Sequence, residues 1–324
     1  MEFIALIVFI ILQILFIPLT IIGVGLVFYK QMYVSKRLGV SSTAIEVING
    51  RWTMDVFGIR KDTASVKLNQ QLPNNSLPGL WMALFPLYIQ YKISGKNRFY
   101  PSIAKPGEEG ITNIVLNRTI YFDNIIEKEK NNVEQFVVMG AGFDTRCYGD
   151  LKNSNLKFFE LDQAKTQQLK REYLEKAEID TSHVNFVEVD FSTEHWYEKL
   201  EAAGYDPNKK SIFLWEGVTL YLSESDVKNT LKEIKSHSAS GSILVADLYA
   251  LQFVNGTMYP GMKSSMKALK ITDEELGFGL GFSSDYKAAL KNFLESENTT
   301  LGDSNFMGYK TKKGTYMVVA EIMI

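Results

Sequence analysis

Three carboxylates and a pair of glycines stand where short apolar runs of this sequence end. Gly140 and Gly142 close one run, and Asp162, Asp190 and Glu216 close three later runs. If these runs are parallel strands, all of these residues meet at the carboxyl edge of one sheet, where such sheets bind ligands. Glycines let a backbone approach a ligand closely, and an acid at the end of a second strand can accept hydrogen bonds from ribose hydroxyls. The pattern predicts a nucleoside site.

The residues at this edge favour an adenosine ligand without phosphates. Thr145 stands where a dinucleotide-binding turn would carry its third glycine, which argues against a pyrophosphate seated on a helix terminus. Clustered carboxylates would repel phosphate, but they tolerate ribose hydroxyls, an adenine amine and a cationic amino-acid group. S-adenosylmethionine carries all of these groups and a sulfonium. Asp162 would then hold the ribose, and Asp190 would receive the adenine amine while Phe191 packs on the ring.

Asp162 also has a purely structural interpretation. It directly precedes residues 163–177, a charged segment predicted to be a helix. An aspartate in that place can cap the first N–H groups of the helix. The two roles are compatible, so the sequence leaves both open.

The elements that position these residues alternate between strand and helix. Apolar runs predict strands at 136–139, 156–161, 184–189, 211–215 and 241–248, and periodic segments predict helices at 111–127, 163–177, 194–204, 224–237 and 285–296. Such alternation predicts an α/β fold with a doubly wound, mostly parallel sheet and right-handed crossovers. Two final runs, 304–310 and 316–322, are joined by Lys312-Lys313-Gly314, which predicts an antiparallel C-terminal hairpin.

Together these segments resemble the class I S-adenosylmethionine-dependent methyltransferases, which have a Rossmann-like fold, and more closely the leucine carboxyl methyltransferase-like family. The resemblance covers roughly residue 111 to the C-terminus. The segments that carry it are Asn117-Arg118-Thr119 with Phe122-Asp123, Val138-Met139-Gly140-Ala141-Gly142-Phe143-Asp144-Thr145-Arg146, Phe159-Glu160-Leu161-Asp162-Gln163, Val189-Asp190-Phe191 and Trp215-Glu216-Gly217-Val218-Thr219-Leu220-Tyr221-Leu222.

The resemblance implies a set of cofactor-binding residues for S-adenosylmethionine. The set is Arg118, Gly140, Gly142, Asp162, Asp190, Phe191 and Glu216. The glycines would approach the methionine part, Glu216 would face its amino group, and Arg118 would pair with its carboxylate, because a guanidinium fork suits a carboxylate. Two structural alternatives stay open: a surface salt bridge for Arg118 and a helix or turn cap for Glu216.

Composition limits the other classes of function. The chain has 324 residues, a net charge of −2 and a pI of about 6.0, so no basic surface for nucleic acid is expected. Cys147 is the single cysteine, and the three histidines are scattered without metal-ligand spacing. We therefore expect neither an intrachain disulfide nor a metal site.

The first segment of the chain predicts a membrane anchor. Residues 3–29 contain no charged residue, and a helix needs about 20 apolar residues to cross a bilayer. Only Glu2 precedes the segment, whereas Lys30, Lys36 and Arg37 follow it, which predicts a single-pass protein with its catalytic domain in the cytoplasm. The expected organisation is a transmembrane anchor over 1–30, a helical cap or lid region over 31–110 and a methyltransferase domain over 111–324.

The cap region contains helical, apolar and loop-forming segments. The pattern of residues 35–71 predicts helical, amphipathic structure, and that of 92–110 predicts a loop. Residues 80–91 are apolar but too short, and too interrupted by Pro86, to span a membrane comfortably. They could be a membrane-surface segment, a lid over an apolar pocket or a plain core helix. Together with 249–262, they are the candidate acceptor pocket.

The expected function is transfer of a methyl group from S-adenosylmethionine to a carboxylate or hydroxyl of a small or membrane-associated acceptor. Transfer from a sulfonium depends mainly on positioning an in-line nucleophile. An ionised carboxylate needs no general base, and no catalytic residue is assigned. The alternatives are a non-catalytic, membrane-tethered adenosine-ligand binding protein and a nucleotide-dependent oxidoreductase. The resembled family's best-known acceptor, the C-terminal leucine of a protein phosphatase subunit, is not expected here, because an anchor favours an acceptor in the lipid bilayer.

Overall fold

The centre of the protein is a seven-stranded sheet in the order β3-β2-β1-β4-β5-β7-β6. A computed structural model describes residues 1–191, 195–282 and 285–324. The strands are β1 (Gln135–Met139), β2 (Lys157–Asp162), β3 (Val184–Glu188), β4 (Ser211–Trp215), β5 (Ile243–Tyr249), β6 (Thr300–Met307) and β7 (Met317–Met323). Strands β1 to β5 are parallel, and β7 is antiparallel to both β5 and β6. This confirms the predicted sheet and its C-terminal hairpin.

The apolar runs of the sequence are the inner strands of this sheet. Every residue of β1 and β4 is buried. Strands covered on both faces read as continuous apolar runs rather than as an alternation, which is why their positions were predictable. The edge strand β6 begins at Thr300, whereas the sequence predicted a start at Ser304. Thr300, Gly302 and Asp303 are exposed and not apolar, so no apolar run marks the beginning of this strand.

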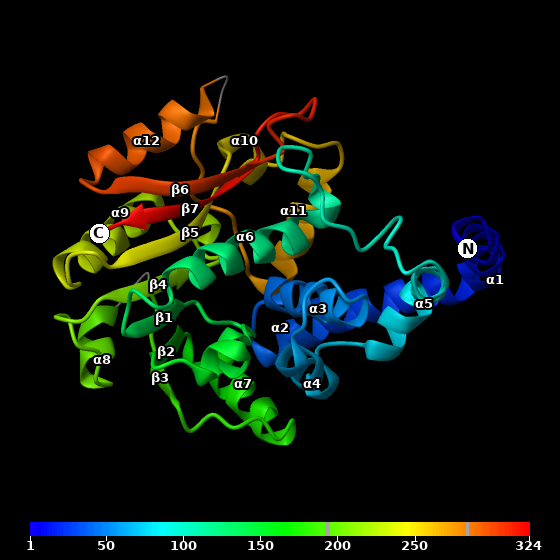
Figure 1. Ribbon diagram of the computed structural model, residues 1–324, viewed down its shortest axis with the longest axis horizontal. Helices are drawn as coiled ribbons and strands as arrows, with labels where there is room; N and C mark the ends of the chain where they lie inside the picture. The colour runs from blue at the N-terminus through cyan, green and yellow to red at the C-terminus, as the bar shows by residue number, and fades with distance from the viewer. Residues whose placement is uncertain (192–194, 283–284) are drawn as a thin grey trace.

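Helices surround the sheet and extend from it (Figure 1). They are α1 (Glu2–Tyr29), α2 (Ser35–Leu38), α3 (Ser42–Val56), α4 (Thr63–Gln71), α5 (Leu77–Ser94), α6 (Ile114–Glu129), α7 (Ala164–Lys176), α8 (Trp196–Ala202), α9 (Glu224–Ser236), α10 (Leu251–Val254), α11 (Met262–Leu269) and α12 (Tyr286–Ser296). The expected start of one helix at Glu194 lies outside the described residues.

Residues 35–71 are largely helical, as predicted, but they do not form one continuous helix. The chain forms α2, α3 and α4 instead, and the breaks fall at Gly39 and Gly58, whose φ angles are +67° and +66°. This left-handed backbone ends a helix at little cost only for glycine. The break lets α3 turn across the carboxyl edge of the sheet.

Asp162 is not the cap of α7, so that structural interpretation is also wrong. Strand β2 continues through Asp162, and Gln163 occupies the N-cap position. The Asp162 carboxylate instead accepts hydrogen bonds from the backbone N–H groups of Gly142 and Gln163. It therefore supports the glycine turn of the neighbouring strand.

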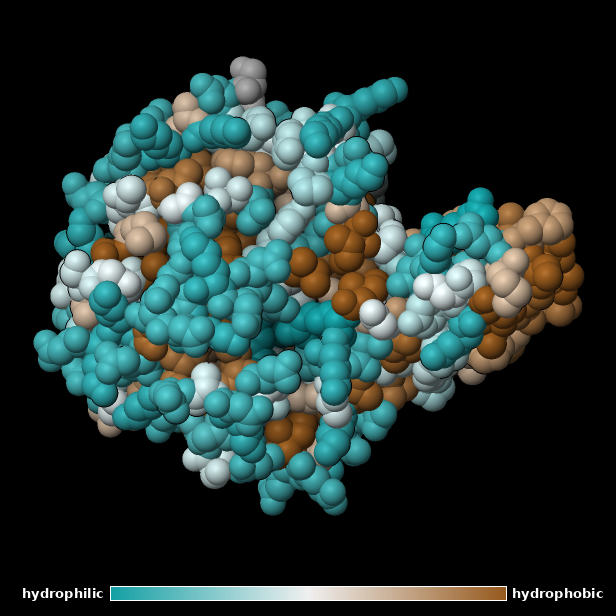
Figure 2. Space-filling model, in the orientation of Figure 1, coloured by the Kyte–Doolittle hydropathy of each residue, from teal (hydrophilic) through white to brown (hydrophobic). Residues whose placement is uncertain are grey.

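Helix α1 runs alongside α5, and both project from the sheet (Figure 1). The backbones touch, because a Cβ placed on Gly23 would lie 2.5 Å from the carbonyl oxygen of Gly79. Stacked rings of Phe16 and Phe85, 5.2 Å apart, continue the contact toward the N-terminus. The outer side of α1 stays uncovered, and Figure 2 shows it as a hydrophobic arm at the edge of the molecule.

The predicted lid role of residues 80–91 is wrong. These residues belong to α5, which packs between α1 and the end of α3, with Trp81 against Trp52 and Tyr88 against Phe57. Pro86 lies inside the helix without ending it. Because α5 faces α1 and α3, it contributes nothing to the cavity described below.

Candidate active site

A cavity of about 1490 Å³ lies at the carboxyl edge of the sheet, under α3 and α11. All the residues that the sequence proposed for cofactor binding line it: Arg118, Gly140, Gly142, Asp162, Asp190, Phe191 and Glu216. They come from α6 and from the segments that follow β1 to β4. The topology brings them together because parallel strands present their carboxyl ends on one edge.

The glycine turn after β1 needs both of its glycines. Gly140 and Gly142 have φ angles of +67° and +43°. A Cβ at Gly140 would lie 2.4 Å from Cγ2 of Val218, closer than side chains approach one another. The N–H of Gly142 donates to Asp162, and burial raises the pKa of that carboxyl, whereas the two backbone donors oppose the shift. The turn and the acid of β2 thus form one rigid corner.

Asp190 and Phe191 follow β3 on the same rim. Gln163 Nε2 lies 3.4 Å from Asp190 Oδ2, which joins the rims after β2 and β3. The ring of Phe191 packs edge-on against Trp196 at 5.8 Å between centroids, and it is half-buried. An aromatic ring held beside a carboxylate matches what an adenine ring and its amine require.

Glu216 lies at the centre of an arginine cluster. Its carboxylate oxygens are 2.6 Å from Arg146 Nη1, 3.0 Å from Arg51 Nη2 and 3.3 Å from Arg118 Nε. These guanidinium groups outweigh the cost of burial and lower the pKa of Glu216 to about 2. Glu216 is therefore ionised, and it caps neither a helix nor a turn.

Arg118 is buried within the molecule, so the surface salt bridge considered for it is wrong. Its Nη1 donates to Asp247 Oδ2 at 3.0 Å and to the Tyr249 hydroxyl at 2.7 Å. Tyr249 in turn donates to Asp247 at 2.8 Å. These contacts fix the guanidinium at the floor of the cavity, between the ends of β4 and β5.

Sequence reasoning missed three members of the cluster: Arg51, Asp144 and Arg146. Arg51 reaches from α3 to Asp144 at 2.8 Å, and Arg146 donates to Asp123 of α6 at 2.7 Å. Asp144 and Arg146 stood in the glycine-turn motif but received no role. Arg51 had no local signal at all, because it lies about ninety residues upstream of the turn.

The cavity fits the amino-acid end of S-adenosylmethionine. Arg51 Nη1 is a buried donor without a hydrogen-bond partner, and Arg118 Nε and Glu216 Oε1, 3.3 Å apart, form an ion pair without a hydrogen bond. Buried polar atoms of this kind need partners. A ligand that carries both a carboxylate and an ammonium group would satisfy donors and acceptor alike. The rim acids Asp162 and Asp190 would hold the adenosine part.

The other part of the cavity is apolar and is covered by α11. Its walls include Phe28 and Met32 from the end of α1 and the turn after it, and Met262, Met266 and Leu269 from α11. The segment 249–262, proposed as an acceptor pocket, also contributes to these walls through Tyr249, Phe253 and Tyr259. This part of the cavity offers space for an apolar acceptor next to the cofactor residues.

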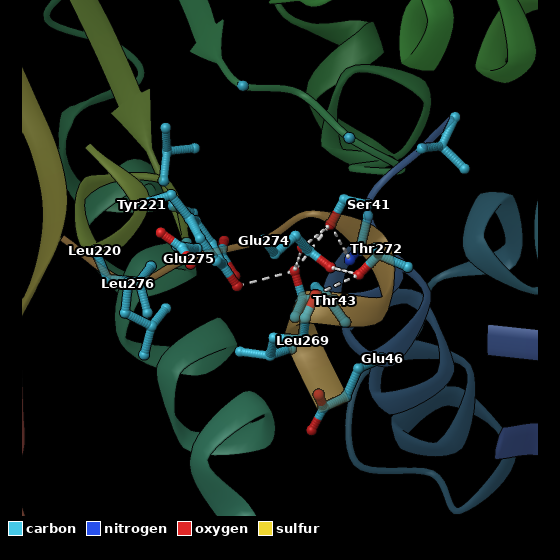
Figure 3. A pocket seen from close by; sticks show the side chains of 18 of the residues that line it. Ser41, Thr43, Glu46, Leu220, Tyr221, Leu269, Thr272, Glu274, Glu275 and Leu276 are labelled. Atoms are coloured by element: carbon cyan, nitrogen blue, oxygen red, sulfur yellow. Dashed lines mark hydrogen bonds between the residues drawn. The ribbon is translucent and has the colours of Figure 1, made fainter. Parts of the chain in front are cut away.

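A single carboxylate fastens α11 over the cavity. Glu274, just after α11, accepts hydrogen bonds from Ser41 Oγ at 2.7 Å, Ser42 N at 3.1 Å and Thr43 Oγ1 at 2.9 Å (Figure 3). These donors are the first residues of α3, where the helix dipole favours a negative charge. Through these hydrogen bonds Glu274 holds the end of α11 against α3, the helix that carries Arg51.

Comparison with known proteins agrees with this geometry. A family model described as leucine carboxyl methyltransferase matches residues 90–235. The chain is 34% identical over 136 residues, 41% of its length and 44% of the other's, to YktD of Bacillus subtilis (strain 168), provisionally named an S-adenosyl-L-methionine-dependent methyltransferase. A provisionally named methyltransferase of the same kind from Mycobacteroides abscessus is 27% identical over 210 residues, 64% of this chain and 66% of that protein. The chain therefore spans less than two thirds of these relatives.

Solved structures with a related fold are more distant. Magnesium protoporphyrin IX methyltransferase from Synechocystis PCC 6803, with bound S-adenosylhomocysteine, has 9% identity and a TM-score of 0.41, over 68% of this chain and 90% of that one. Over residues 90–235 the chain is similar to the leucine carboxyl methyltransferase family, and the relatives that it matches are provisionally named S-adenosyl-L-methionine-dependent methyltransferases.

Proposed function

We propose that this protein transfers the methyl group of S-adenosylmethionine to an oxygen, of a carboxylate or a hydroxyl, on an apolar or membrane-associated acceptor. The observation that carries the proposal is the continuity of one cavity. It joins the glycine turn and the arginine cluster to walls formed by the foot of α1 and by α11. An acceptor that enters from the foot of α1 would meet the methyl group inside the protein, away from water.

The cofactor residues keep their proposed roles. Gly140 and Gly142 approach the methionine part, Asp162 holds the ribose, and Asp190 with Phe191 holds the adenine. Arg118 and Glu216 face the carboxylate and the ammonium group of the methionine. The buried donor Arg51 Nη1, which has no hydrogen-bond partner and belongs to the same cluster, supports a ligand carboxylate at this place.

We further propose that α1 attaches the protein to a membrane as a single-pass anchor, with the domain on the cytoplasmic side. The helix is long and apolar enough to cross a bilayer. Its two polar side chains at mid-length, Gln13 and Thr20, are half-buried, and Thr20 reaches toward α5. The uncovered positions, such as Ile14 and Leu15 at 63% and 66% exposure, are apolar. This distribution suits lipid rather than water.

For α1 to span a membrane, the contacts at its N-terminal end would have to break. Glu2 pairs with Lys96, and Phe9 stacks on Phe99 at 5.0 Å. Residues 95–110 then return to the domain as an irregular segment, and irregular backbone is not tolerated in lipid. A spanning α1 must therefore separate from residues 95–99, whereas a helix that keeps these contacts would lie along the membrane surface.

Cofactor binding by the full-length protein in detergent tests the enzyme proposal. We expect S-adenosylmethionine and S-adenosylhomocysteine to bind and NAD not to bind. Asp162→Ala should weaken binding by about tenfold or more, which corresponds to roughly 1.4 kcal/mol for lost hydrogen bonds to ribose. Asp180→Ala, at an exposed aspartate paired with Lys152, is the matched control. Preference for NAD, or equal affinity of Asp162→Ala and wild type, would contradict the proposal.

Labelling from one side of sealed vesicles tests the anchor. The variant is Glu2→Cys, and the chain's own Cys147 is buried and should not react. If α1 spans the membrane, an impermeant maleimide should label the new cysteine only from the side opposite the domain. Labelling from the domain's side would show that α1 lies along the surface. Failure of the wild-type protein to float with vesicles would contradict membrane attachment altogether.

A further inference from the structure

One carboxylate in the acceptor part of the cavity has no role in the arrangement described so far. Glu46 lies on α3 and lines the cavity together with Thr43 and Val47, its neighbours on the same side of the helix. Ala44, on another face of α3, packs against the cofactor turn, because its Cβ is 3.5 Å from the position that a Cβ on Gly142 would occupy. Glu46 lies near enough to Arg118 and Glu274, which line the same cavity, for their charges to act on its carboxylate.

The Glu46 carboxylate lines the cavity and is unpartnered in the described part of the chain. Enough protein lies around it to raise its pKa, although the residue keeps exposed surface. No side chain in the described part of the chain donates a hydrogen bond or forms an ion pair with it. In Figure 3 it lies apart from the hydrogen bonds that hold Glu274. Every other acid placed at this site above, from Asp162 to Glu274, has a named partner.

The surroundings of Glu46 favour proton uptake. Burial raises the pKa of the Glu46 carboxyl, and the charge of Glu274 adds to the rise, whereas Arg118 opposes it. The phenols of Tyr100 and Tyr221 also lie near enough to feel its charge. A carboxylate with a raised pKa is a stronger base than one in water, which is the property required of a general base near neutral pH.

We propose that Glu46 is the base of the methyl transfer and that the acceptor is a hydroxyl group on an apolar molecule. The inference rests on the proposed function and narrows it. A carboxylate acceptor would be repelled by Glu46 and would need no base. A hydroxyl is attracted, because its proton can hydrogen-bond to the carboxylate.

The step balances without any further reactant. The hydroxyl oxygen forms a bond to the methyl carbon as the bond between that carbon and sulfur breaks. The bonding pair stays on sulfur, which changes from a sulfonium to a neutral thioether in S-adenosylhomocysteine. The hydroxyl proton passes to Glu46, and the product is a methyl ether. Glu46 later releases its proton to water as the cavity opens.

The nature of the methyl linkage tests the proposal. The full-length protein would be incubated with methyl-labelled S-adenosylmethionine and a total lipid extract of the cells that make it. Methyl ethers resist mild alkali, whereas methyl esters release labelled methanol. We expect alkali-stable label. Glu46→Gln should lower its rate about a hundredfold, because general bases contribute roughly 10² to 10⁴. Affinity for S-adenosylhomocysteine should not change.

A pH profile separates a base from a merely structural residue. The wild-type rate should fall with falling pH as Glu46 becomes protonated, and Glu46→Gln should lack this acid limb. The matched control is Glu275→Gln, at an exposed acid on the rim of the same cavity that pairs with Lys270, and it should behave as wild type.

Each remaining outcome decides against one proposal or both. Alkali-labile label, or a Glu46→Gln rate equal to wild type, would overturn the role of Glu46 and leave the methyltransferase proposal standing. Cofactor binding without label in any lipid would overturn both and favour a non-catalytic adenosine-ligand binding protein. Absence of cofactor binding would contradict the proposed function itself.

Discussion

Glu216→Gln should destabilise the protein more than any surface change, because the arginine cluster would lose a buried negative charge. The carboxylate faces Arg51, Arg118 and Arg146 and is only 6% exposed. Removing one partner of a buried ion pair typically costs about 3–5 kcal/mol. The pKa of Glu216 indicates a loss of the same order, since its fall from 4.5 to about 2 corresponds to roughly 3 kcal/mol.

Denaturation of the full-length protein in detergent measures this loss, and a second variant isolates its cause. Glu216→Gln combined with Arg51→Met removes one charge of each sign, so most of the stability should return. The exposed acid Glu172, paired with Lys176, provides the control, because Glu172→Gln should cost only about 0.3–0.5 kcal/mol. A loss below about 1 kcal/mol for Glu216→Gln, or a double variant less stable than it, would refute charge imbalance as the reason.

The same group predicts how stability depends on pH. The pKa of Glu216 is lower in the folded protein than in the unfolded chain, so its contribution is complete above pH 4.5. The contribution is lost as pH falls toward about 2. Glu216→Gln should therefore flatten the acid limb of the stability profile. An acid limb of unchanged steepness would count against the ionised state of Glu216.

Three further changes test other parts of the structure. Gly140→Ala should weaken S-adenosylhomocysteine binding about tenfold in a titration, because a left-handed residue other than glycine costs roughly 1–3 kcal/mol and its Cβ would meet Val218; unchanged affinity would contradict the tight turn. Gly23→Leu should force α1 away from α5, so that a disulfide engineered between the two helices no longer forms. Gly25→Leu is the control: a Cβ at Gly25 has nothing within 4 Å, so the same disulfide should still form. Glu274→Gln should speed backbone hydrogen exchange over residues 262–276, since hydrogen bonds to a charged group contribute roughly 1.5–3 kcal/mol each. Exchange as slow as in wild type would contradict the role of Glu274 in holding α11 against α3.

Much of the sheet and of the cofactor rim could be predicted because their signals are local. Strand β4 occupies the predicted residues, Ser211–Trp215, since a strand buried on both faces must be a continuous apolar run. The rim residues follow such runs directly, so locating the strands also located Asp162, Asp190 and Glu216. The breaks within the helical segment 35–71 were not predicted, because they depend on two glycines, which many helices tolerate.

The sequence by itself thus determined the succession of strands and helices along the chain and several of the residues at the carboxyl edge of the sheet. Only the tertiary structure decided what surrounds them. Arg51 pairs with Glu216, Glu46 faces the cavity, and α5 packs on α1 rather than over the acceptor. Periodicity records which face of an element is buried, but not which distant element covers it. Ion pairs and cavity walls between segments far apart in the chain therefore leave no local pattern, and they follow from the packing alone.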